Sequence, residues 1–92
     1  MHSSLTLSML NFTRRIKTPL GHLSFYFNEI YTIHGVQFHI SVVGPDRKVL
    51  AFNMREMQGK WQLQNSQTCP GWIVDLEEEL GKSITEELIS GE

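Results

Sequence analysis

Residues 36–43 read Val-Gln-Phe-His-Ile-Ser-Val-Val, and this stretch decides the fold. Its apolar side chains recur at every second position from Val36 to Val42. Period two is typical of a β-strand with one buried face, because successive side chains of a strand point to opposite sides. The same alternation, interrupted by turn residues such as Gly35 and Pro45, predicts further strands on either side. These strands cover residues 10–17, 23–33, 48–54 and 60–64.

The second predicted strand changes phase along its length. From Leu23 to Phe27 every second side chain is apolar, but Ile30 and Ile33 do not continue that alternation. A β-bulge adds one residue to a strand and so shifts the phase. We therefore predict a bulge near residues 27–30 that returns both isoleucines to the core.

Beyond residue 70 the apolar side chains recur at every third or fourth position, which is the pattern of an amphipathic helix. We predict a helix over residues 70–89, with Pro70 in the first turn, where its missing N–H is tolerated. Gly81 costs about 1 kcal/mol relative to alanine inside a helix, so it indicates either close packing against the sheet or a weak point. The buried stripe is expected to comprise Trp72, Ile73, Leu76, Leu80 and Ile84, and Leu88 is expected to lie off it, because the stripe drifts around the helix.

Short connections make consecutive strands antiparallel neighbours. We therefore expect an α+β fold: an antiparallel four- to five-stranded β-meander over residues 10–64, with one C-terminal helix packed on one face. The 92 residues are expected to form a single domain, with a frayed start over residues 1–9. Residues 4–17 also fit helical spacing, so an N-terminal helix is the alternative for that segment.

The face of the sheet away from the helix is the candidate interaction surface. Its predicted side chains are polar but uncharged, and small apolar residues lie among them. Antiparallel sheets often leave one face in water, which is the simpler interpretation. The alternative is contact with a protein partner or with a second copy of the chain in a homodimer. The candidate residues are Tyr26, Gln37, His39, Ser41, Asn53, Gln62 and Gln64.

The charges divide unevenly along the chain. Seven of the ten acidic residues follow Cys69, together with only one of the eight basic residues, Lys82. An acidic solvent face on the helix explains this distribution. The cluster of Arg14, Arg15 and Lys17 is short for a nucleic-acid site, so nucleic acid is disfavoured as a partner.

No catalytic or metal-binding constellation is evident. The four histidines have no acid or cysteine at a spacing that would complete a ligand set, so no metal is expected. His39 and Ser41 are two residues apart on one strand, about 7 Å, which is too far for a nucleophile and its base. Cys69 precedes the predicted helix, where a thiol pKa is lowered, but no base can be assigned to it. We therefore predict a non-enzymatic protein without a cofactor.

A second functional class is a small-ligand-binding or regulatory subunit, with a pocket between Trp72 of the C-terminal helix and the sheet.

The cellular compartment is predicted from the same sequence. A single cysteine favours a reducing compartment, and neither a secretory signal nor an apolar run of membrane-spanning length is recognised. A cytoplasmic location without membrane contact is therefore expected.

Overall fold

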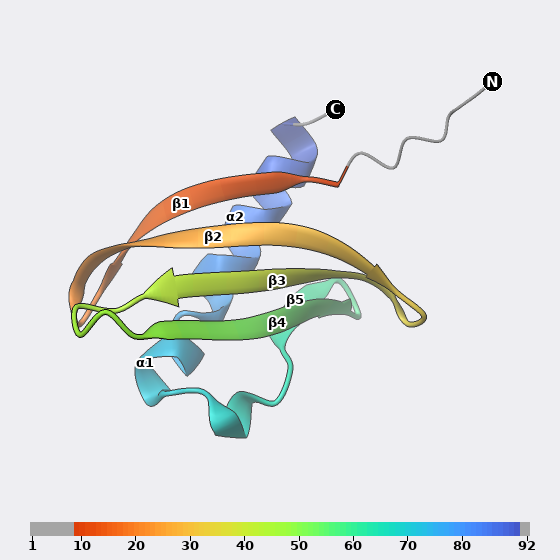
Figure 1. Cartoon of the computed structure of the whole chain (residues 1–92). Coiled ribbons are helices and arrows are strands. Elements are labelled where there is room, and N and C mark those ends of the chain that lie inside the picture. The colour runs from red at the N-terminus through yellow and green to blue at the C-terminus, as the bar shows by residue number, and fades with distance from the viewer. Residues whose placement is uncertain (1–8, 91–92) are drawn as a thin grey trace.

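The computed structural model describes residues 9–90, and Figure 1 shows their arrangement. Five strands are followed by a short 3-10 turn and two helices. The strands are β1 (Asn11–Thr18), β2 (Gly21–Thr32), β3 (Gly35–Val43), β4 (Val49–Met57) and β5 (Lys60–Leu63). The remaining elements are η1 (Ser66–Thr68), α1 (Gly71–Val74) and α2 (Glu77–Ser90).

The five strands form one sheet in the order β1-β2-β3-β4-β5, and every pairing is antiparallel. The predicted meander is therefore confirmed, with five strands. Tight turns join the strands, and Gly35 has a φ of 103°, a left-handed conformation that glycine adopts without strain. The strand interpretation of the first described residues is confirmed by β1, whereas the expectation for residues 1–8 lies outside the described part of the chain.

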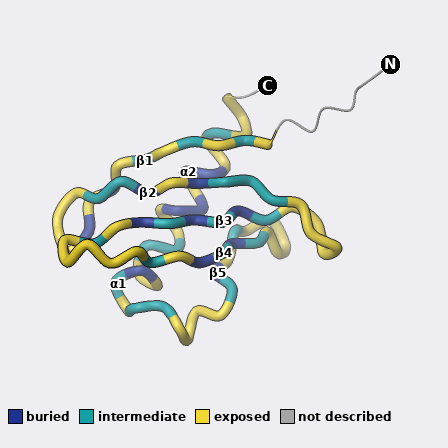
Figure 2. The backbone as a smooth tube through the Cα atoms, in the orientation of Figure 1, coloured by how far each residue is buried: buried dark blue, intermediate teal, exposed yellow. Residues whose placement is uncertain are grey.

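The hydrophobic core lies between the sheet and the two helices. Figure 2 shows buried positions alternating along the central strands and recurring on α2. Phe12 adds an aromatic contact at the edge, with its ring stacked on Phe27 at a centroid distance of 4.5 Å. The fully buried side chains are Phe25, Phe27, Phe38, Ile40, Val42, Met54, Ile73, Leu80 and Ile84.

The predicted bulge in β2 is wrong. The pairing of β2 is continuous with β1 through Asn28 and with β3 through Thr32. Side chains of β2 therefore alternate between the two faces of the sheet without a shift. Glu29, not Ile30, therefore lies on the helix side, where its Oε1 accepts a hydrogen bond from the Leu10 N–H at 2.8 Å. Ile33 lies in the turn and is 95% exposed. An acid is tolerated on the inner side here because it bonds a backbone group near the end of the sheet.

The structure divides the predicted helix 70–89 into α1 and α2. The helix begins where expected, with Pro70 as the N-cap of α1. Between the two helices, the Leu76 N–H bonds the Ile73 carbonyl, three residues back, instead of one four residues back. Ile73, Leu80 and Ile84 of the predicted stripe are fully buried. Trp72 and Leu76 are half-buried, and Leu88 is exposed.

Candidate interaction surfaces

The strand register places the predicted interaction residues on the sheet face that α2 does not cover. We call this the open face. Tyr26 lies opposite Ser41, His39 opposite Asn53, and Gln37 and Gln62 both lie opposite Arg55. Gln64 follows β5 and donates its N–H to the Asn53 carbonyl at 2.9 Å, which continues the same row.

A row of amide and imidazole side chains crosses the middle of the open face. Asn11, Asn28, His39 and Asn53 are consecutive cross-strand neighbours. His39 Nδ1 and Asn53 Oδ1 are 2.8 Å apart, and because the amide oxygen can only accept, the ring takes the Nδ1–H tautomer, in which Nε2 is an acceptor. Such a row both donates and accepts hydrogen bonds without carrying a fixed charge.

The charged side chains of the open face are all basic. Arg15 and Lys17 lie on β1 near the β1–β2 turn, and Arg55 and Lys60 lie at the opposite corner of the sheet. The two acids of the strands, Glu29 and Glu56, pair with Phe38 and Trp61 on the other face. Sequence reasoning missed Arg55 and Ile30 as members of the open face, although the cross-strand register identifies both.

The basic cluster of the sequence is divided between the two faces of the sheet. Arg14 points toward α2, where its guanidinium nitrogens lie 3.0 Å from Glu86 Oε1 and 3.2 Å from Glu87 Oε2. These hydrogen bonds to the two glutamates raise the Arg14 pKa above its ordinary value. Arg15 and Lys17 form no ion pair with another residue of the described segment 9–90.

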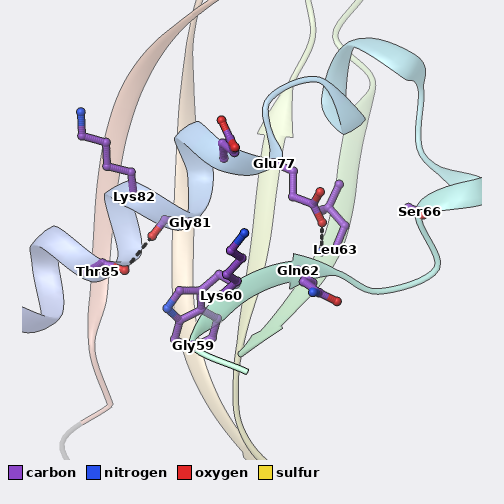
Figure 3. Close-up of a pocket in the computed structure, with 11 residues that line it drawn as sticks. Gly59, Lys60, Gln62, Leu63, Ser66, Glu77, Gly81, Lys82 and Thr85 are labelled. Atoms are coloured by element: carbon purple, nitrogen blue, oxygen red, sulfur yellow. Dashed lines mark hydrogen bonds between the residues drawn. The ribbon is translucent and has the colours of Figure 1, made fainter. Parts of the chain in front are cut away.

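Among residues 9–90, hollows also occur beside α2 and beside α1. The first, of about 570 Å³, lies along the junction of β5 and α2 (Figure 3). On its wall, Glu77 Oε2 accepts a hydrogen bond from the Leu63 N–H at 2.8 Å. The second, of about 410 Å³, places Trp72 and Pro70 beside the strand turns. Its other lining residues are Leu20, Gly44, Pro45, Asp46, Lys48 and Leu50.

Cys69 lies at the position expected from the sequence, just before α1, and is half-buried against the core. Burial raises the pKa of its thiol, which is opposite to the lowering that a thiolate nucleophile needs. Within residues 9–90 no group of three or more His, Cys, Asp or Glu side chains is placed to hold a metal ion.

Comparison of the chain with protein-family models, with curated proteins and with solved structures found no significant match. Neither of the helices in the described part of the chain has the length and apolar character needed to cross a membrane.

Proposed function

We propose that this protein is a small, non-enzymatic protein-interaction domain that self-associates through its open face. The observation that carries the proposal is a sheet face that neither helix of the described residues 9–90 covers, and whose centre is polar but uncharged. A reducing, cytoplasmic compartment suits the single free thiol of Cys69.

Hydrogen-bonding capacity supports pairing of two open faces. Amide side chains and the His39 ring both donate and accept, so the row can complement itself across a twofold axis. The basic side chains lie at two opposite corners. Two copies can therefore pack with each basic corner over an uncharged part of the other face.

The edges of the sheet favour self-association less than the open face does. At β5 the outward Leu63 N–H is already bonded by Glu77 of α2. At β1 a second copy would place Arg14, Arg15 and Lys17 against the same three residues. Like charges on opposite strands destabilise pairing.

Sedimentation equilibrium across a concentration series tests this proposal. The His39→Lys/Gln62→Lys double variant adds charge to the open face, so it should sediment as a monomer where the unchanged chain forms dimers. The matched control is Glu78→Lys, which makes the same change in net charge at an exposed position of α2, on the other side of the sheet. The proposal fails if the double variant associates as the unchanged chain does, or if the unchanged chain is monomeric throughout.

A second candidate function is ligand binding in the hollow beside Trp72. This hollow combines apolar walls with Asp46 and Lys48, the usual composition of a small-molecule site. In a Trp61→Phe background only Trp72 emits, so a metabolite panel can be screened by tryptophan fluorescence. A response that Leu20→Glu abolishes supports a site there, whereas an unchanged spectrum across the panel contradicts it.

A further inference from the structure

We propose that the outer edge of β1 binds an extended segment of a partner protein that carries alternating acidic and apolar side chains, as a sixth strand of the sheet. This site lies at an edge of the sheet, so it is separate from the self-association proposed for the open face.

The backbone of β1 offers unpaired hydrogen-bonding groups along one side. The Glu29 N–H bonds the Leu10 carbonyl at 2.8 Å, so Leu10 and Glu29 form a hydrogen-bonded pair. Such pairs alternate along an antiparallel ladder with pairs whose backbone groups point outward. The outward-pointing N–H and C=O groups of β1 are therefore those of Asn11, Thr13, Arg15 and Lys17. No hydrogen bond joins these groups to another residue in the range 9–90. An added strand would satisfy them, as in strand-addition complexes.

The charge of β1 selects the partner. The eight residues of β1 include three basic residues and no acid. Arg14 is occupied by Glu86 and Glu87, but Arg15 and Lys17 project from the open face beside the free edge. Acidic side chains at every second position of an added strand would lie next to these two. A basic edge also repels copies of itself, so it excludes the competing β1–β1 pairing.

The opposite face of the added strand would meet an overhang of α2. This helix crosses beneath the sheet from β5, which Glu77 contacts, to β1, which Glu86 and Glu87 contact. Its last turn continues beyond β1 (Figure 1). There Leu88 is 37% and Ile89 67% exposed. Apolar side chains of a sixth strand would cover this turn, because strand side chains alternate between the two faces.

The test uses a fluorescein-labelled peptide, Glu-Val-Glu-Val-Glu-Val-Glu, titrated with the full chain and followed by anisotropy. Binding is expected to weaken with added salt and to shift the backbone amide NMR signals of Asn11, Thr13, Arg15 and Lys17. Arg15→Glu/Lys17→Glu should weaken binding at least about tenfold. This variant should instead prefer a peptide in which each Glu is replaced by Lys. The matched control, Arg55→Glu/Lys60→Glu, changes the opposite corner of the open face and should bind as before.

A backbone variant separates strand addition from simple charge attraction. The Thr13 N–H points away from β2, so Thr13→Pro removes an edge donor without removing a hydrogen bond of the β1–β2 ladder. Binding should be lost while the circular dichroism spectrum is unchanged. The proposal is overturned if Thr13→Pro binds the peptide as tightly as the unchanged chain does. It is also overturned if Arg55→Glu/Lys60→Glu loses as much affinity as Arg15→Glu/Lys17→Glu, or if the unchanged chain does not bind at millimolar peptide. The open-face test changes His39 and Gln62, so either proposal can fail without the other.

Discussion

Gly81 of α2 lies directly against Trp61 of β5. A Cβ atom on residue 81 would lie 3.1 Å from the Trp61 Cβ and 3.6 Å from its carbonyl oxygen. The Trp61 ring is held edge-to-face on Phe38, with a centroid distance of 5.3 Å, so it has little room to retreat. Of the two interpretations of this glycine, close packing against the sheet is therefore the correct one.

The first prediction concerns this contact. Gly81→Ala should destabilise the fold by about 1 kcal/mol, because overpacking outweighs the gain in helix propensity. The matched control is Gly71→Ala, where a Cβ would meet nothing within 4 Å and the backbone is helical. That variant should be neutral or stabilising by up to about 1 kcal/mol. Urea unfolding measures both, and a Gly81→Ala protein more stable than Gly71→Ala would contradict the packing argument.

Glu77 is predicted to stabilise the β5 edge. Glu77→Ala leaves the partly buried Leu63 N–H without its acceptor, which should cost about 1–2 kcal/mol of unfolding free energy. Glu78→Ala is the control, because Glu78 also lies in the first turn of α2 but is exposed. Both variants lose the same favourable interaction with the helix dipole, so their difference isolates the hydrogen bond. Equal unfolding free energies would show that this bond contributes nothing.

The ion pairs of Arg14 should contribute modestly. Arg14→Ala removes the link between β1 and the end of α2, and we expect a loss of about 0.5–1 kcal/mol that shrinks at high salt. Arg15→Ala is the neighbouring control and should change stability by less than about 0.5 kcal/mol. Thermal unfolding at low and high sodium chloride measures both. A salt-independent loss for Arg14→Ala would assign the effect to packing of its side chain.

Cys69 predicts a dependence of stability on pH. Burial raises the pKa of the folded thiol, so between the ordinary thiol pKa and this raised value the folded chain holds a proton that the unfolded chain has released. Stability contributed by the neutral thiol is therefore complete below about pH 8.5 and is lost as the pH rises through the folded pKa. Unfolding free energies of the unchanged chain and of Cys69→Ala should diverge in that alkaline range. If the two proteins show the same pH dependence of unfolding free energy, Cys69 makes no pH-dependent contribution to stability.

The periodicity of the sequence was sufficient for most of the fold. Alternation around Phe38 and Ile40 reports one buried face, and the same pattern gave the composition of the open face, including His39 and Asn53. Residues directly opposite each other on paired strands point to the same face of the sheet, so one strand with a clear pattern determines which residues of its neighbours face the core.

Other features depend on contacts between distant residues. Glu29 occupies an inner position because it bonds the Leu10 N–H, and no local pattern reveals that partner. The overhang of α2 beyond β1 likewise depends on how helix and sheet are placed, and so do the turn residues, such as Pro45 and Asp46, that line the hollow beside Trp72. Periodicity assigns a side chain to a face but does not give the relative placement of elements.

The central claim is self-association through the open face, and an NMR dilution series with ¹⁵N-labelled protein tests it most directly. Amide signals of Tyr26, His39 and Ser41 should shift with protein concentration, while those of Glu78 and Lys82 on α2 stay constant. Signals independent of concentration up to the millimolar range, or shifts confined to α2, would contradict the claim.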